Sequence, residues 1–307
     1  MIVFERVNVM KKLFADGSLL FVAFIWGSTF VIVQNAIQTL PPHLFNGIRF
    51  LLAAIILSLF VGKKEKKFIT LKLMKAGTFL GFFLFIGYAF QTVGLIYTTS
   101  SKAGFITGLS VLIVPILATY YLKEPPKLII FISAGFGTVG LYFLTLAGIS
   151  QINFGDLLIL ICAIGFAFHI VFTSKFTEQH PALPLTIIQL LTVSILSFLS
   201  SFTFEKTLVS LNQVLHGDVI FALLITSIFA TAIAFYIQTK FQQFTSAARV
   251  AIIFAMEPVF AAITAFFVLN ERLSMYGLIG CLFIFTAMIT TEIPKLLKRE
   301  LKQTNHI

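Results

Sequence analysis

FTSAARVAIIFAMEPVFAAITAFFVLNER, residues 244–272, is an apolar run with a carboxylate and a proline side by side at its centre. Its apolar part, about 250–269, is long enough to cross a hydrocarbon core of roughly 30 Å, and Glu257 falls near the middle. A carboxylate at that depth costs at least ~2.5 kcal/mol, and Pro258 disturbs the helix at the same level. Such a site usually faces a cavity, so this run predicts a membrane helix with a polar function at its midpoint.

The composition of the whole chain indicates a multi-pass membrane protein. Its 307 residues are 58% hydrophobic and 11% charged, with a mean hydropathy of +1.00, which leaves too little polar surface for a soluble domain. The net charge of +10 comes from short basic clusters between apolar runs, so membrane topology explains it and no nucleic acid partner is expected. Cys162 and Cys281 lie inside apolar runs without metal-ligand spacing, so neither a disulfide framework nor a metal site is expected.

The hydrophobic pattern predicts an all-α integral membrane protein with ten transmembrane helices. The runs lie at about 17–38, 43–62, 74–94, 103–121, 128–147, 155–174, 183–203, 217–238, 248–269 and 274–293. The first run begins after Asp16 and lacks a small-residue cleavage site, so we expect a retained helix rather than a signal peptide. The connections are short and polar, which leaves no room for a separate soluble domain.

Lysine and arginine are strongly biased to one side of this predicted topology. With the N-terminus in the cytoplasm, the opposite side holds only Lys102, Lys206 and Arg272, with Arg49 counted as intramembrane. This bias predicts a multi-pass membrane protein with both termini in the cytoplasm.

The chain also repeats itself. Residues 17–20 and 155–158 match at an offset of 138, and 97–102 match 244–249 at an offset of 147. Because each half has an odd number of predicted helices, five, the second half must enter the membrane upside down relative to the first. We therefore expect two inverted five-helix repeats, residues 1–148 and residues 149–307 with a basic cytoplasmic tail. Secondary transporters have this arrangement, with the substrate site near the midplane between the halves.

Several short motifs give the chain a family resemblance. They are Trp26-Gly27-Ser28 with Phe30, Arg49-Phe50, Tyr97-Thr98-Thr99-Ser100, and Glu257-Pro258-Val259 followed by Asn270-Glu271-Arg272-Leu273. Together they resemble the EamA family of the drug/metabolite transporter superfamily over about residues 17–293. The resemblance implies a ten-helix inner-membrane carrier, often an exporter of amino acids or related small metabolites. The first half departs from the pattern, with Ser110-Val111 in place of Glu257-Pro258 and a loop that reads Lys123-Glu124-Pro125-Pro126.

Glu257 and Arg49 are the charged residues predicted to lie on a substrate or proton pathway. Glu257 could exchange a proton or pair with a cationic group of the substrate, while the alternative is a structural acid near the kink at Pro258. Arg49 lies about two turns into the second run, where it could bind a substrate carboxylate with two hydrogen bonds. The alternative is that its side chain extends to the outer interface.

Uncharged residues complete the predicted pathway. His169 could relay protons or form a hydrogen bond across helices. Trp26, the only tryptophan, could stack on a substrate, close a gate or fill space next to Gly27. The remaining candidates could line a cavity or make interhelical hydrogen bonds, and they are Gln91, Tyr88, Asn46 and Gln238.

Lys102 and Arg249 occupy matching positions in the two halves, so the inversion places them near opposite mouths of a central path. They could attract anionic substrates or act as gates, while the alternative is ordinary anchoring at the interface. Gly104 and Gly108 have the spacing of small residues where helices approach closely.

These patterns predict a secondary transporter that exports a small polar metabolite, such as an amino acid, by alternating access. Proton coupling would depend on Glu257, so the substrate, H⁺ and membrane lipids are the expected partners, and a homodimer is left open. The alternatives are a passive facilitator or exchanger of the same fold and a non-transporting membrane partner subunit. No Walker loop or nucleophile elbow is present, so we expect neither an ATP-driven pump nor an enzyme, and no cofactor.

Overall fold

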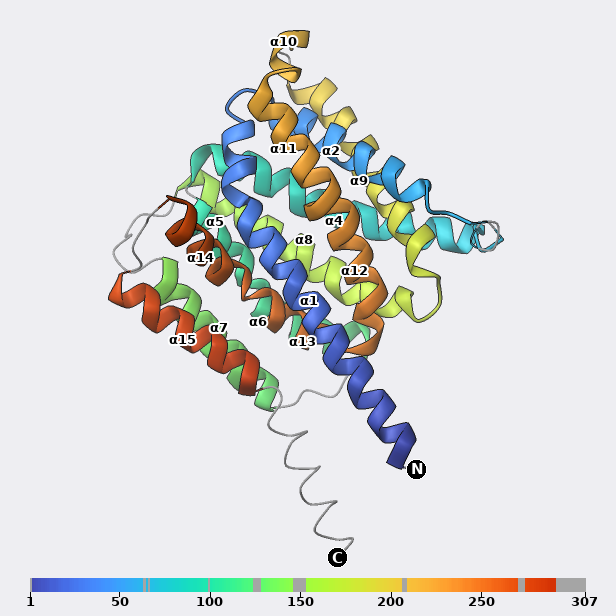
Figure 1. The fold of residues 1–307 in the computed structure, drawn as a ribbon, viewed down its shortest axis with the longest axis vertical. Coiled ribbons are helices and arrows are strands. Elements are labelled where there is room, and N and C mark those ends of the chain that lie inside the picture. Colours follow the sequence, from blue (N-terminus) through green and yellow to red (C-terminus); the bar gives the residue numbers. More distant parts are fainter. Residues whose placement is uncertain are drawn as a thin grey trace, which may run out of the picture.

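Apolar runs with few charges form long helices in the computed structural model (Figure 1), which describes residues 2–62, 65, 67–98, 100–123, 128–145, 153–205, 209–269 and 274–290. The longer helices are α1 (Ile2–Ala36), α2 (Pro42–Ser58), α4 (Leu71–Tyr97), α7 (Leu128–Thr145), α8 (Phe154–Thr177), α9 (Ala182–Phe204) and α15 (Met275–Thr290). The shorter ones are α5 (Ser100–Gly108), α6 (Ser110–Tyr121), α10 (Leu211–Val214), α11 (Gly217–Ser227), α12 (Ala234–Phe241), α13 (Ala247–Phe254) and α14 (Glu257–Leu269). A π-helix, η1 (Ile228–Ile233), joins α11 to α12, and a 3₁₀ turn, η2 (Gln242–Phe244), follows α12.

Six helical stretches of the described chain are long and apolar enough to cross a membrane. They are Met10–Ala36, Leu71–Tyr97, Ala103–Tyr121, Phe154–Thr177, Ala182–Phe204 and Gly217–Phe244, and shorter apolar helices cover Pro42–Ser58, Leu128–Phe143 and Met275–Thr290. The predicted all-α class is therefore confirmed for the described residues, and the long stretches fit a multi-pass membrane protein. The first helix begins well before residue 17, because no glycine or proline precedes Gly17 to end it.

Two of the predicted runs are broken at their centres. The run at 103–121 divides at Leu109 into α5 and α6, and the run at 248–269 divides at residues 255–256 into α13 and α14. Pro258 is the second residue of α14, where its missing N–H removes no intrahelical bond. Discontinuous membrane helices of this kind occur where irregular backbone lines a cavity.

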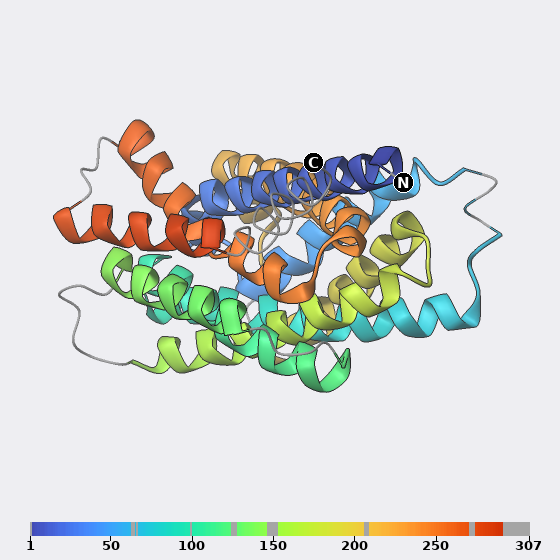
Figure 2. The ribbon, with the colours of Figure 1, turned by 90° about the horizontal axis from the view of Figure 1, so that it is seen from below.

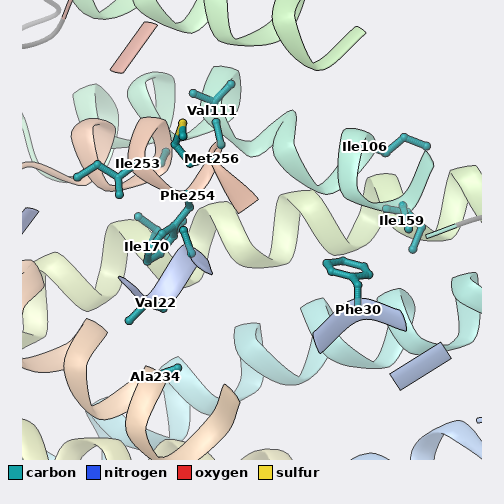
Figure 3. Packing of buried hydrophobic residues seen from close by; sticks show 14 of the residues in the cluster. Val22, Phe30, Ile106, Val111, Ile159, Ile170, Ala234, Ile253, Phe254 and Met256 are labelled. Atoms are coloured by element: carbon teal, nitrogen blue, oxygen red, sulfur yellow. The ribbon is translucent and has the colours of Figure 1, made fainter. Parts of the chain in front are cut away.

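The helices of the two halves of the sequence are interleaved. The helix α4 packs against α8 and α9, α2 packs against α9, and α1 runs across the bundle beside α12, α13 and α14. The helices α7 and α15 lie together at one edge of the bundle, as both views show (Figures 1 and 2). The main apolar cluster fills the space between these elements, and Val22 of α1, Ile170 of α8 and Phe254 of α13 converge there (Figure 3).

Glycine allows α1 to reach the broken helix. A Cβ atom at Gly27 would lie 2.3 Å from the carbonyl oxygen of Glu257 and 2.9 Å from the amide nitrogen of Ala261, so only glycine fits this contact. At Gly104 of α5 a Cβ atom would meet Pro258 at 3.7 Å, an ordinary van der Waals distance. The backbone of α1 therefore touches α14 directly at the level of Glu257.

The first turn of α2 is capped from another helix. It begins at Pro42, and Pro41 before it offers no side-chain hydrogen bond to cap the helix. The carboxylate of Glu205, just past α9, accepts hydrogen bonds from the backbone N–H groups of His43 at 2.6 Å and Leu44 at 3.0 Å. This contact satisfies otherwise free donors and fixes α2, the helix that carries Arg49, against α9.

Candidate functional site

A cavity lies where the two broken helices meet α1, α2, α4, α8 and α12. The cavity has a volume of about 70 Å³, several times the roughly 10–15 Å³ that one water needs. Residues from both ends of the sequence form its wall, including Trp26, Phe30, Arg49, Tyr88, Gln91, Thr107, Ser110, Phe166, His169, Phe235, Gln238, Phe254, Glu257 and Pro258.

The structure brings together all but one of the residues predicted for the substrate or proton pathway. Glu257, Pro258, Arg49, Trp26, His169, Gln91 and Tyr88 all line this cavity. Gln238 also lines it, whereas Asn46 is fully buried and donates hydrogen bonds to Thr92 and to the carbonyl of Tyr88. Their roles in transport stay predictions.

Glu257 is the first residue of α14 and faces the cavity. The positive end of the helix dipole lies there, which favours a carboxylate. Among the residues that the structure describes, none donates a hydrogen bond to this carboxylate. A buried acid usually has a partner, so an acid that faces a cavity without one is suited to bind a group that arrives from outside.

Arg49 is held inside the bundle. Its side chain donates from Nε to Oγ1 of Thr231 at 2.7 Å and from Nη2 to the carbonyl oxygen of Ala230 at 3.3 Å. Its Cζ lies 5.0 Å from the ring centroid of Tyr88, and the residue is 3% exposed. The alternative that Arg49 extends to the membrane interface is therefore wrong, because its guanidinium has hydrogen-bond partners and a ring face at its own depth.

Trp26 of α1 packs against the same region. Its indole N–H donates to the carbonyl of Ala230 at 2.8 Å, and its ring lies 5.0 Å from Phe254 and 5.3 Å from Phe235, centroid to centroid. It both fills space beside Gly27 and lines the cavity. Aromatic rings thus form much of the apolar wall.

His169 links three helices through hydrogen bonds. Its Nε2 lies 2.8 Å from Oε1 of Gln189, and Nε2 of Gln189 donates to Oγ1 of Thr239 at 3.0 Å. These bonds join α8, α9 and α12, which is the interhelical role considered for a lone histidine. A role in proton relay stays a prediction.

Arg249, predicted to lie at a gate or mouth, is not part of the cavity wall. It makes a two-point ion pair with Asp16, with Nε to Oδ1 at 2.9 Å and Nη2 to Oδ2 at 2.8 Å. The two side chains are 8% and 12% exposed, so the pair is largely buried between α1 and α13. The side chain of Lys102 lies outside the described residues, as do Lys206, Arg272, the 270–273 motif, residues 124–127 and the C-terminal basic tail from 291.

The sequence patterns did not point to several of the residues described above. Four of them line the cavity, and they are Ser110, Phe166, Phe235 and Phe254. Two others hold predicted residues in place, Thr231 on Arg49 and Asp16 on Arg249. One signal was present, because the offset of 147 that relates the two halves also relates Tyr88 to Phe235 and Gln91 to Gln238. For Thr231, whose contact depends on the π-helix, the sequence has no such signal.

Comparison with known proteins identifies the type of protein to which this cavity belongs. The sequence model of the EamA-like transporter family matches residues 13–146 and again residues 153–292. The chain belongs to this family. It is therefore a multi-pass membrane protein of a transporter family rather than a member of an enzyme family.

The relatives of this EamA-like transporter carry transporter names. An uncharacterized transporter of Archaeoglobus fulgidus is 34% identical over 92% of this chain and 87% of its own length. The uncharacterized transporter YetK of Bacillus subtilis is 26% identical over 94% of this chain and 90% of its own. The uncharacterized inner membrane transporter YedA of Escherichia coli is 26% identical over about half of each chain, 52% and 53%.

A solved structure, titled only as the crystal structure of a protein, has the same fold. It aligns with a TM-score of 0.75 over 90% of this chain and 97% of the other, at 18% sequence identity. At that identity the likeness concerns the fold alone. It supports the overall helix arrangement that positions the cavity.

Proposed function

We propose that this EamA-like transporter exports a small zwitterion, such as an amino acid or a related metabolite, by alternating access around the cavity. The observation that carries the proposal is that two opposite charges, Arg49 and Glu257, line the same cavity among aromatic rings. A zwitterion would present its carboxylate to Arg49 and its ammonium to Glu257, so both charges would be matched at a depth where an unmatched charge is costly.

The size of the cavity fits a small solute. Its volume of about 70 Å³ is several times the roughly 10–15 Å³ that one water needs, so the cavity has room for more than a single water. Glu257, half-buried and without a protein donor in the described chain, is also the group through which a proton would be coupled to transport.

The proposed architecture is ten transmembrane helices in two inverted repeats, residues 1–148 and 149–307, with both termini cytoplasmic. Two observations support it. The family sequence model matches the chain twice, and the two helix breaks, at 109 and 256, are separated by the same 147 residues as the repeated motifs. Broken helices near the midplane, where the two repeats meet, are typical of secondary transporters.

Binding is tested first with the purified full chain. L-amino acids are titrated one by one while the fluorescence of Trp26, the only tryptophan, and the thermal unfolding temperature are recorded, since a bound ligand raises apparent stability. We expect a hit that is lost in Glu257→Gln and in Arg49→Lys but kept in Glu178→Gln, whose carboxylate is exposed at the end of α8. A hit that survives both cavity variants contradicts the proposed site.

Transport is tested next in proteoliposomes loaded with the amino acid that binds. Accumulation driven by an imposed pH gradient, and abolished in Glu257→Gln, supports a proton-coupled transporter. Saturable equilibration without accumulation indicates a passive facilitator or exchanger. Absence of any saturable flux, together with a stoichiometric protein partner on purification, indicates a partner subunit instead.

A further inference from the structure

The π-helix η1 interrupts the long helix between α11 and α12 beside the cavity. Here a backbone N–H bonds five residues back rather than four, as Ala234 does to the carbonyl of Phe229. This geometry is rare, and it appears mostly as single turns inside α-helices and frequently at functional sites. It places Ala230 and Thr231, both fully buried, opposite α1 and α2.

Three side-chain hydrogen bonds from two other helices converge on this π-helix. Arg49 of α2 donates to the Thr231 hydroxyl at 2.7 Å and to the Ala230 carbonyl at 3.3 Å. Trp26 of α1 donates to the same Ala230 carbonyl at 2.8 Å. The π-helix therefore fixes the side chains of Arg49 and Trp26, which both line the cavity.

The contact made by Thr231 differs from that of a neighbouring threonine. Thr226, one turn earlier and also fully buried, donates its hydroxyl back to Ala222 of its own helix at 2.6 Å. A threonine hydroxyl inside a membrane helix commonly donates its hydrogen bond in this way, to a carbonyl of the preceding turn. The Thr231 hydroxyl instead accepts from the guanidinium of another helix, and this bond is the shorter of the two that hold Arg49.

The geometry leaves donors on Arg49 for a ligand. A guanidinium has five N–H groups, and the bonds to Thr231 and Ala230 use one on Nε and one on Nη2. The ring of Tyr88 covers one face, with its centroid 5.0 Å from Cζ. Even if the Tyr88 hydroxyl takes a third N–H, two remain, which is the number that a carboxylate accepts in a bidentate pair.

We propose that Thr231 is the positioning residue of the substrate site: its hydroxyl, with the Ala230 carbonyl, turns the Arg49 guanidinium so that the remaining N–H groups receive the carboxylate of the substrate. This inference deepens the proposed function and rests on it. Thr231 fixes the angle of the guanidinium and does not itself touch the substrate. Specificity for a carboxylate over an uncharged group at that end of the cavity follows from this fixed angle.

The test follows the reaction of phenylglyoxal, an arginine reagent, with Arg49 of the purified full chain, by peptide mass spectrometry. Thr231→Val keeps the shape but removes the acceptor, so Arg49 is expected to react roughly tenfold faster, because a hydrogen bond to a charged group is lost. Thr231→Ser keeps the hydroxyl and should react within about twofold of wild type. Thr226→Val, the matched control, loses a buried hydroxyl of the same helix and should leave the rate unchanged.

A second arm adds L-leucine or L-leucinamide, which lacks the carboxylate, before the reagent. In the wild type L-leucine should protect Arg49 and L-leucinamide should not, and in Thr231→Val this difference should disappear. An unchanged Arg49 rate in Thr231→Val overturns the positioning role, even where L-leucine still protects and the proposed function stands. If Thr231→Val does not fold, Thr231→Ala, which removes the same acceptor with less bulk, gives the same reading.

The two failures can be told apart. Suppose that Arg49 reacts faster in Thr231→Val and at the wild-type rate in Thr231→Ser, but that neither L-leucine nor any other titrated L-amino acid protects it. Thr231 then holds Arg49 as proposed, while its assignment to a carboxylate substrate is overturned. In that case the proposed amino-acid substrate fails with it. Equal acceleration in Thr226→Val would show a general loosening of the helix and would overturn the inference.

Discussion

The two broken helices share a geometry but differ in chemistry. The pair α5–α6 breaks at Leu109 and the pair α13–α14 at Met256, positions related by the offset of 147. Each second segment begins with a residue on the cavity wall, Ser110 in one and Glu257 in the other. Both halves of the sequence therefore help to build the cavity, while only one of the two breaks brings a charge to it.

The opposite charge comes from the other half of the sequence. Arg49 lies in the range matched first by the family model and Glu257 in the range matched second. A ligand that bridges these two residues would connect both halves at once, so its binding would be sensitive to any movement of one half against the other.

The largest effect is expected when the charge at the second break is removed. Glu257→Gln should lower transport by roughly a thousandfold, because the ammonium group of the substrate would lose the carboxylate with which it pairs. Truncating one partner of a buried charge pair costs about 4 kcal/mol. Ser110→Ala, at the matching break, should keep transport within about threefold of wild type. Uptake in proteoliposomes measures both. Similar losses in the two variants would show that the charge is not the decisive difference.

The next effect concerns the stability that the ion pair between α13 and α1 provides. Arg249→Gln leaves the carboxylate of Asp16 buried without its ion-pair partner, and the free energy of unfolding should fall by about 3 kcal/mol. Asp16→Asn combined with Arg249→Gln should recover most of this loss, since no uncompensated charge remains. Thermal unfolding in detergent measures the cycle. A double variant no more stable than Arg249→Gln would contradict a direct pairing.

A smaller effect on stability is expected at the two glycines that contact α14, Gly27 and Gly104. Gly27→Ala forces a Cβ atom against the backbone of Glu257 and should destabilise the protein by about 2 kcal/mol. Gly104→Ala meets only Pro258 at an ordinary distance, and the better helix propensity of alanine should leave stability equal or slightly higher. Equal unfolding temperatures for the two variants would mean that α1 does not bear directly on α14.

The smallest effect compares the glutamines related by the same offset. Gln238 donates to Gln242 at 3.2 Å, and Gln242 in turn donates to Ser174, so Gln238→Leu should cost about 1 kcal/mol. Gln91 donates to Thr107 at 3.4 Å, a longer bond, and Gln91→Leu should cost about half as much. The difference is read from the unfolding temperatures, and a reversed order would contradict this ranking.

The sequence predicts the parts of the site whose residue types are costly in a membrane. A carboxylate or a guanidinium inside an apolar run needs a reason to be there, so Glu257 and Arg49 could be picked out by their position alone. The helical class and the approximate runs follow from hydropathy in the same way. The break at residues 255–256 agrees with the expected disturbance beside Pro258, whereas the break at Leu109 carries no proline and was not expected.

The remaining features depend on contacts between distant parts of the chain. Thr231 is an ordinary residue for a membrane helix, and its hydrogen bond to Arg49 exists only because a π-helix presents it to a residue 182 positions away. Asp16 was expected to precede the first span, yet α1 continues through it and its partner lies 233 positions away. No local pattern encodes such pairs, because each is decided by how the helices pack.

The contact at Gly27 also has a mechanical consequence. Two backbones meet there with no side chain between them, and side chains hold the crossing on either side: the hydroxyls of Ser28 and Thr264 lie 3.1 Å apart, and the rings of Phe24 and Phe260 pack edge to face at 5.5 Å. These lateral contacts resist sliding of α1 along α14, so the point of contact acts as a fixed pivot. Glu257 is the first residue of α14 and lies at this pivot, so we expect a tilt of α1 to be passed directly to the backbone that carries the carboxylate.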